Sequence, residues 1–389
     1  MEESFWRDYD LTARKDKIIR AFANEPIRTA DDVPIITSTG NYFGSGGHKR
    51  PVQYWEDPAV MLEFQTDYFT EHMANVNDDM IPYFMPWFGT GVLASGFGCK
   101  TKHATGNGDD PAVVSCPVEK PSDVARLKQP DPNQDGLMPK ALSFIEYARK
   151  HGDLPVGPTD LNSPLCTAAQ ICGYDNLFVW MYEEPNLVHD LMEMITEAFI
   201  KWVKLQKEYI GEPLNQSNAL QGVWSPEGIG VWISDDDLVS VSPGLYEEFV
   251  VPYYSRLFNE FEGGSLHYCG VGTHHLDNFG KITGLRAINN SPMGKAEAFR
   301  KLVEGKPKGT LIQIQDSAPE NPKEYYGMLF SEVRDFTGIM VATWVCDTIA
   351  VNNSGGYTFV DWDIYKVANK MVGVIREIVA QKQCAQEQQ

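Results

Sequence analysis

Short apolar segments alternate with long amphipathic segments from residue 154 to residue 382 of this 389-residue chain. The short segments are rich in Val, Ile and Leu, and the long ones carry apolar residues at helical spacing, which predicts strands followed by helices. This alternation makes neighbouring strands parallel, and about seven or eight such units favour an α/β fold, a closed (β/α)8 TIM barrel. Strands are expected at residues 154–160, 230–236, 264–270, 285–290, 310–316 and 339–347, and helices at 184–211, 242–261, 294–305, 321–338 and 360–382.

The first 130 residues follow this alternation less regularly, because glycine, proline and aromatic residues interrupt it. A helix is indicated at residues 57–76, where Asp57 supplies an N-cap and Pro58 the first helical position. A buried strand that opens into an aromatic loop is expected within residues 80–98. We expect residues 1–389 to form a single barrel domain, with residues 1–75 as an N-terminal extension that packs on the barrel.

The chain is strongly acidic, with 33 Lys and Arg against 53 Asp and Glu, and a formal net charge of −20. A surface of this charge repels phosphate backbones and anionic lipid, so we expect neither nucleic-acid nor membrane binding. The charged start of the chain has no apolar signal region, and no apolar run approaches the length of a membrane helix, which favours a cytoplasmic protein. The seven cysteines include no CxxC pair and are expected to be free thiols, metal ligands or core residues.

A His-x-Cys pair, His267 and Cys269, lies in the expected strand at residues 264–270. Side chains two residues apart on a strand point to the same face, so both could bind one ion. Cys346, at the end of the last expected strand, could supply a third ligand, and this His and Cys set suits Zn²⁺. The alternative is a chance pair in which the cysteine packs in the core. His274 and His275 fall in the following loop and are expected to be solvated or capping residues.

Other strand ends supply further candidates for a site at the carboxyl end of the barrel. Asp235 is either a cap at a helix entry or a carboxylate at the barrel mouth, whereas Asp236 and Asp237 are expected at the surface. Aromatic side chains near strand ends either line a substrate pocket or belong to the core. The proposed pocket residues are Trp87, Phe88, Asp160, Asn162, Trp224, Trp232 and Trp344. No lysine or arginine is predicted at these strand ends.

Five stretches of the chain resemble the uroporphyrinogen decarboxylase superfamily, over roughly residues 150–380. These stretches are LPVGPTDLNSPLCTAAQICGYDNLFVWMYEEPNLVHDLMEMITEAFIKWVK, ISDDDLVSVSPGLYEEFVVPYYSRLF, LHYCG, LIQIQDSAPENP and IMVATWVCD. The resemblance implies a (β/α)8 barrel, in agreement with the alternation above. The porphyrinogen decarboxylases of this superfamily carry an arginine-rich N-terminal segment for the substrate carboxylates, and this chain has no such segment. The second branch of the superfamily contains zinc- and corrinoid-dependent methyltransferases.

The methyltransferase branch uses a His-x-Cys pair and a distant cysteine as zinc ligands. The resemblance therefore implies that His267, Cys269 and Cys346 hold Zn²⁺ and are catalytic. The match at Cys346 is one of position, because Asp347 follows this cysteine where the branch has glycines on both sides. Asp235 matches a carboxylate that is common at its position in the family and is also counted as catalytic. Asp235, Asp347 and water are all candidates for the fourth ligand.

The resemblance also implies a methyl transfer to or from a corrinoid (cobalamin) carried by a partner protein, and a homodimer is expected. Because the strand ends lack basic residues, we favour a neutral aromatic methyl ether as the methyl donor, with transfer to Co(I) of the corrinoid. A basic side chain of Lys49, Arg50 or Lys100 inside the pocket would argue against this donor. The first alternative is a methylcobamide:thiol methyltransferase with a thiol such as coenzyme M. The second is a porphyrinogen decarboxylase-like or non-catalytic barrel without a metal.

Overall fold

The computed structural model describes residues 9–39, 50–103, 110–219, 222–346, 348–352 and 356–387. A six-stranded parallel sheet has the order β1-β8-β7-β6-β5-β4, so consecutive strands of the second half lie side by side. Its strands are β1 (Ile35–Thr39), β4 (Val231–Ser234), β5 (Gly264–Cys269), β6 (Leu285–Ser291), β7 (Leu311–Ile314) and β8 (Ile339–Val345). Two antiparallel hairpins, β2–β3 and β9–β10, are formed by β2 (Thr101–His103), β3 (Pro111–Val113), β9 (Ile349–Val351) and β10 (Tyr357–Phe359).

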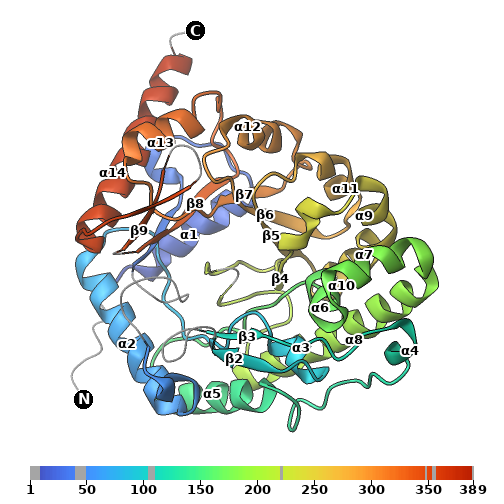
Figure 1. Cartoon of the computed structure of the whole chain (residues 1–389). Helices are drawn as coiled ribbons and strands as arrows, with labels where there is room; N and C mark the ends of the chain where they lie inside the picture. The colour runs from blue at the N-terminus through green and yellow to red at the C-terminus, as the bar shows by residue number, and fades with distance from the viewer. Residues whose placement is uncertain are drawn as a thin grey trace.

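Two extended segments, at residues 156–161 and 79–84, close the gap between β4 and β1 in this sheet. The first, at residues 156–161, pairs with β4, because the N–H of Ser234 donates to the carbonyl of Leu161 at 2.9 Å. It also pairs with the second segment through a parallel bridge between Phe84 and Val156. The second segment reaches β1 at Asp79, whose N–H donates to the carbonyl of Ile35 at 2.8 Å. These eight strand positions complete a ring, and the predicted barrel-like α/β architecture is confirmed (Figure 1).

Helices surround the ring of strands on its outside (Figure 1). The core lies between the two layers, where Ile288, Ile312 and Val341 of neighbouring strands are fully buried. The helices are α1 (Leu11–Phe22), α2 (Pro58–Asn75), α3 (Val92–Gly96), α4 (Pro121–Val124), α5 (Met138–His151), α6 (Pro164–Cys172), α7 (Tyr174–Glu183), α8 (Pro185–Ile210), α9 (Pro243–Phe249), α10 (Val251–Glu260), α11 (Leu276–Lys281), α12 (Ala296–Gly305), α13 (Pro322–Leu329) and α14 (Ile364–Glu387). Short 3₁₀ turns are η2 (Ala30–Asp32), η3 (Val52–Trp55), η4 (Asp236–Ser240) and η5 (Thr273–His275).

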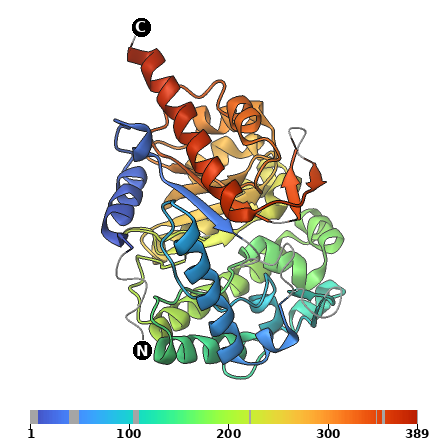
Figure 2. The same cartoon turned by 90° about the vertical axis from the view of Figure 1, so that its left-hand side faces the viewer.

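The first 75 residues contribute to the barrel itself as well as to its outside. β1 is a member of the main sheet, paired in parallel with β8 from Ile35 opposite Val341 to Thr39 opposite Val345. The boundary expected at residue 75 therefore falls at the end of α2, after the first strand and helix of the barrel. Figure 2 shows α1 near the amino end of β1 and the β9–β10 hairpin on the opposite side of the molecule.

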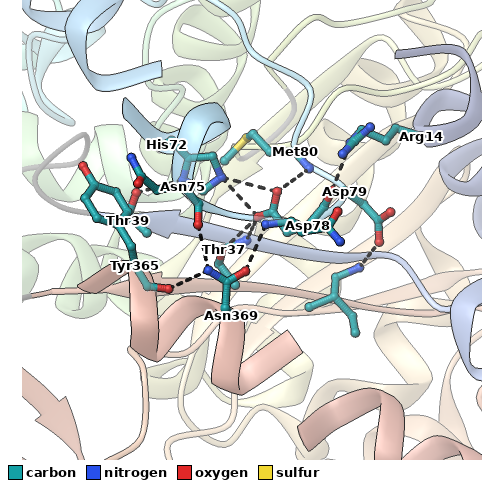
Figure 3. Close-up of polar contacts among 12 residues, drawn as sticks. Arg14, Thr37, Thr39, His72, Asn75, Asp78, Asp79, Met80, Tyr365 and Asn369 are labelled. Atoms are coloured by element: carbon teal, nitrogen blue, oxygen red, sulfur yellow. Dashed lines mark hydrogen bonds and ion pairs between the residues drawn. The ribbon is translucent and has the colours of Figure 1, made fainter. Parts of the chain in front are cut away.

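A buried hydrogen-bond network ties β1 to the end of α2 (Figure 3). The Asp78 carboxylate accepts from the N–H and the hydroxyl of Thr37, at 2.7 and 2.8 Å, and from the N–H of Met80 at 3.0 Å. The His72 ring lies between this carboxylate and Thr39, with one nitrogen 3.3 Å from Asp78 Oδ1 and the other 2.8 Å from Thr39 Oγ1. His72 and Asp78 are both buried, so the network fixes the position of β1 against α2.

Replacing Asp78 with alanine is expected to lower the free energy of unfolding by about 3–5 kcal/mol, because it leaves buried donors and the His72 ring without their partner. Burial alone would raise the pKa of Asp78, but His72 and the hydrogen bonds from Thr37 and Met80 hold it below its ordinary value of 3.8. The ionised carboxylate therefore stabilises the fold at higher pH, and this contribution is lost as the pH falls below about 4. Urea unfolding at several pH values tests this. An Asp78→Ala variant whose unfolding free energy at pH 7 lies within about 1 kcal/mol of wild type would contradict this prediction, because a change that small is typical of surface substitutions.

Candidate active site

A cavity of about 330 Å³ opens where the carboxyl ends of the strands meet. Its walls combine indole rings, from Trp87, Trp232 and Trp344, with carboxylates, from Asp110, Asp160 and Asp236. Its other polar lining includes Ser234, His267, Cys269 and Gln315. In barrels of this kind the carboxyl ends of the strands are where reactive groups gather, so this cavity is the candidate active site.

Strand register explains why polar side chains from several strands meet here. Ser234 of β4 is the partner of His267 on β5, and His267 is in turn the partner of Asn289 on β6. Two residues further along the strands, Cys269 is the partner of Ser291. Because side chains alternate across a strand, each set of partners forms one layer on the same face of the sheet. His267 and Cys269 therefore lie on the same face of β5, as predicted, and both line the cavity.

Three potential metal ligands lie together in this cavity, from Asp236, His267 and Cys269, with their ligand atoms all within 4.8 Å of one another. Nε2 of His267 is 3.5 Å from Sγ of Cys269 and 3.6 Å from Oδ1 of Asp236. Zinc bonds of about 2.0–2.3 Å at tetrahedral angles separate such ligand atoms by about 3.4–3.6 Å. The three residues therefore fit a Zn²⁺ ion and leave a fourth position for a substrate or water.

Hydrogen bonds fix the orientation of the His267 and Asp236 side chains. Nδ1 of His267 is 2.6 Å from Oδ1 of Asn289, which favours the tautomer with the proton on Nδ1 and leaves the lone pair of Nε2 facing Cys269. Oδ1 of Asp236 accepts from the backbone N–H of Cys269 at 2.8 Å. The ligand set is thus held in place by the strands β5 and β6 rather than by mobile side chains alone.

Replacing Asn289 with alanine is expected to weaken zinc binding by about 10–100-fold, because the His267 ring loses the partner that sets its orientation and tautomer. Competition with a chromophoric chelator measures the affinity. Asn259→Ala, which removes an exposed amide bonded to Thr283, serves as the matched control. Equal zinc affinity in the Asn289 variant and wild type would contradict the assigned role.

The surroundings of Cys269 keep its thiol protonated when no metal is bound. Burial raises the pKa of this thiol, and the negative charges of Asp236 and Asp316 raise it further. Asp316 is itself buried and accepts a hydrogen bond from the hydroxyl of Ser291 at 2.5 Å and one from Tyr325. A thiolate at this position therefore needs a cation beside it, which is what a metal ion provides.

Cys346 is buried and does not belong to the group of three ligands within 4.8 Å. Its carbonyl accepts from the indole N–H of Trp362 at 2.6 Å. The structure thus brings Asp236 to the position that sequence reasoning gave to Cys346. Asp347, a candidate fourth ligand, lies outside the described residues.

Asp235 points away from the cavity into the layer between strands and helices. Its carboxylate is fully buried and accepts from the hydroxyls of Tyr246 and Tyr254, at 3.0 and 2.7 Å, and from the thiol of Cys166 at 3.6 Å. Burial raises its pKa to about 7, against the opposing effect of the Tyr254 hydrogen bond. Its N–H donates to the carbonyl of His267 at 2.8 Å. These contacts hold the end of β4 against β5 and the helices outside.

The other predicted pocket residues divide into two groups. Trp87, Asp160, Trp232 and Trp344 line the cavity, as described above. Phe88 instead lines a second cavity next to Trp55, and Asn162 forms a parallel bridge with Ser234. The Trp224 ring faces the ammonium group of Lys15 on α1, at 4.9 Å from the ring centroid. Phe88, Asn162 and Trp224 are therefore not brought into the cavity.

No lysine or arginine is among the described residues that line the cavity. Arg50 is buried near it, but its guanidinium lies 3.0 Å from Oδ1 of Asp110 and close to the rings of Tyr54 and Trp55. Its charge is thus balanced by a carboxylate between it and the cavity. Lys100 is exposed, and Lys49 lies outside the described residues.

The sequence placed Asn289 and Gln315 at strand ends without a role in the site, and it led us to expect Asp236 at the surface; all three belong to the site or contact it. The role of Asp236 could have been found by extending the alternation of β4, because Trp232, Ser234 and Asp236 all line the cavity at intervals of two. No comparable signal in the sequence indicates that Asn289 would orient His267, since this depends on the register between β5 and β6.

Comparison with known proteins places the chain among relatives of two activities. The family described as Uroporphyrinogen decarboxylase (URO-D) matches residues 13–307. A methylated-thiol–coenzyme M methyltransferase of Methanosarcina mazei is 28% identical over 191 residues, 48% of this chain and 46% of that protein. A uroporphyrinogen decarboxylase of Halalkalibacterium halodurans is 27% identical over 173 residues, 43% of this chain and 45% of that protein. The matched part of the chain thus spans somewhat less than half the length of these relatives.

A solved structure, a methyltransferase from Methanosarcina mazei, has the same fold over nearly the whole length of both chains. The TM-score is 0.64, with 18% sequence identity, and the match covers 94% of this chain and 99% of that one. Among the described residues, no helix combines the length and the apolar character that crossing a membrane requires.

Proposed function

The chain belongs to the uroporphyrinogen decarboxylase family, and we propose that it is a zinc-dependent methyltransferase that moves a methyl group from an aromatic methyl ether to the Co(I) corrinoid of a partner protein. The observation that carries the proposal is the group of Asp236, His267 and Cys269 in a cavity with indole walls. A Zn²⁺ ion bound there would act as a Lewis acid on the oxygen of the methyl donor and make it a better leaving group.

The side chains of this cavity suit the binding of an uncharged ring. Trp87, Trp232 and Trp344 offer apolar faces on which an aromatic donor can pack. The charge of Asp110 is balanced by Arg50, and that of Asp236 would be balanced by the metal. A carboxylate-bearing donor would find no free cation among the described lining residues, which supports a neutral donor.

We also propose that the partner is a corrinoid protein and that the chain acts in the cytoplasm. The cavity opens at the face where a corrinoid protein would have to present its cobalt, since the methyl donor is bound there. All seven cysteines are free thiols, as expected for a protein that acts in the reducing cytoplasm. The homodimer expected from the sequence stays a prediction.

A thiol acceptor is the second candidate, and the name of the Methanosarcina mazei relative favours it. In this version, a methylcobamide donates the methyl group to a thiol such as coenzyme M, and the same three ligands hold the zinc. Porphyrinogen decarboxylation is supported by the other relatives but not by the cavity, because a polycarboxylate substrate needs cations that the described lining does not offer.

A donor screen with a corrinoid protein held as Co(I) tests these alternatives. We expect the spectrum of methyl-Co(III) to appear with an aromatic methyl ether and to require the chain. Parallel reactions contain methylcobalamin with coenzyme M, or uroporphyrinogen. Methyl transfer only to the thiol would favour the second candidate, and decarboxylation without methyl transfer would overturn the proposal.

A further inference from the structure

Asp316 is a buried carboxylate that follows β7 and is not among the residues that line the cavity. Its side chain accepts a hydrogen bond from the hydroxyl of Ser291 at 2.5 Å, from the N–H of Met293 at 3.1 Å and from the hydroxyl of Tyr325. These three donors belong to the end of β6, to the turn after β6 and to α13. Because Asp316 is only 1% exposed, water does not compete for these bonds, and one side chain fastens three parts of the chain together.

The backbone of Asp316 is held as firmly as its side chain. Its carbonyl accepts from the hydroxyl of Thr343 at 2.5 Å and from the N–H of Trp344 at 3.0 Å, both on β8. The following residue, Ser317, forms a parallel bridge with Trp344. The carboxylate is therefore presented from a fixed position where β7 and β8 end, and a side chain in such a position can orient its neighbours.

The turn after β6 depends on these hydrogen bonds for its shape. Met293 has a φ of +47°, in the left-handed region that side chains such as methionine rarely adopt. Such a conformation persists only where the surrounding structure holds it. Here Asp316 accepts from the N–H of Met293, and the hydroxyl oxygen of Tyr325 accepts from the N–H of Gly294 at 2.9 Å. Asp316 and Tyr325 thus fix the path of the chain as it leaves β6.

Ser291 connects this network to the strand that carries two of the proposed metal ligands. Ser291 is the register partner of Cys269, so the two side chains lie on the same face of neighbouring strands. Its carbonyl accepts from the N–H of Gly270, directly after Cys269, at 2.8 Å. The position of the end of β6 therefore determines the position of the end of β5, and Asp316 holds the end of β6.

We infer that Asp316 is a positioning residue for the metal site, which acts through Ser291 on the end of β5 that carries Cys269. The inference rests on the proposed function, because it takes Asp236, His267 and Cys269 as the metal ligands. Its physical basis is geometry. Ligands on a fixed strand end meet the ion at set distances and angles, whereas a strand end that is free to move binds the same ion less tightly.

Four variants separate positioning from stability. Asp316→Ala removes the acceptor of all three donors, whereas Asp316→Asn keeps an acceptor for Ser291 and Met293. Tyr325→Phe loosens the same turn by a single hydroxyl and is a milder second variant if Asp316→Ala does not fold. Asp78→Ala is the matched control, because it empties another buried carboxylate network at β1, and β8, β7 and β6 separate β1 from β5 in the sheet.

Three measurements follow the site itself. In the Co²⁺-substituted chain, the visible absorption bands report the arrangement of the metal ligands. We expect Asp316→Ala to shift these bands and to weaken zinc binding by about 10-fold, with Asp316→Asn close to wild type. In the metal-free chain, the backbone amides of residues 267–270 should exchange hydrogen about 10-fold faster in Asp316→Ala. Tyr325→Phe should show smaller changes in the same direction. Asp78→Ala should lower stability, with the bands, the zinc affinity and the exchange of residues 267–270 relative to the rest of the chain as in wild type.

Wild-type bands and zinc affinity in Asp316→Ala would overturn the inference, as would the same changes in Asp78→Ala. An Asp316→Asn variant that behaves like Asp316→Ala would contradict the role of the hydrogen bonds from Ser291 and Met293. The proposed function is judged separately. A wild-type chain that binds neither Zn²⁺ nor Co²⁺ would contradict the proposed function, and unchanged exchange of residues 267–270 in Asp316→Ala would then overturn the inference as well. Weaker zinc binding in Asp316→Ala, with no methyl transfer by wild type, would support the inference and contradict the proposed function.

Discussion

Replacing His267 with alanine is expected to slow methyl transfer to Co(I) by about 10³-fold or more, since it removes the central ligand of the proposed metal site. Its Nε2 lies 3.5 Å from Sγ of Cys269 and 3.6 Å from Oδ1 of Asp236, so the ring contacts both other ligands. Its loss leaves a thiol and a partly exposed carboxylate, which do not hold zinc tightly by themselves.

The measurement is the single-turnover rate of methyl-Co(III) formation, with the donor that wild type uses best. His274→Ala is the matched control, because His274 is exposed and follows the same strand. It should transfer methyl groups at the wild-type rate. Thermal unfolding of each variant shows that the fold is kept. Wild-type transfer by the His267 variant would mean that the reaction does not use this metal site.

Neighbouring substitutions at Asp235 and Asp236 are expected to have opposite consequences. Asp235→Ala should lower the free energy of unfolding by about 3 kcal/mol or more, because the hydroxyls of Tyr246 and Tyr254 and the thiol of Cys166 lose their buried acceptor. Asp236→Ala should leave stability within about 0.5 kcal/mol of wild type, since this side chain is exposed. The same variant should weaken zinc binding markedly, because a ligand is removed.

Urea unfolding and zinc competition on the same two proteins separate these effects. A stable Asp235 variant that binds zinc normally but fails in methyl transfer would support the catalytic role that the sequence suggested for Asp235. An Asp236 variant with unchanged zinc affinity would instead return the third ligand position to Cys346.

The barrel could be predicted from the sequence because each of its units carries its own signal. Apolar strands and amphipathic helices alternate at short range, and a parallel arrangement follows from that alternation alone. The strand at residues 264–270 was predicted for this reason, and with it the common face of His267 and Cys269. The barrel strand at Ile35–Thr39 was missed, because IITST is short and lies in a region without regular alternation.

The site was harder to predict because it depends on where each strand ends and on register between strands. β4 ends at Ser234, and the chain then turns through η4, so Asp235 faces the helices and Asp236 faces the cavity. A one-residue difference of this kind exchanges the two faces. Likewise, the sequence does not show whether an aromatic residue near a strand end lines the cavity or packs elsewhere. Trp232 lines the cavity, whereas the ring of Trp224 packs near Lys15.

The zinc content of the purified chain, combined with X-ray absorption at the zinc edge, tests whether Asp236, His267 and Cys269 hold zinc. We expect about one zinc per chain, bound by one sulfur with nitrogen and oxygen ligands, and lost in His267→Ala and Cys269→Ala. Cys346→Ala should keep the metal. A chain that takes up no zinc, or whose zinc is unchanged in the His267 and Cys269 variants, would show that these residues do not form a zinc site.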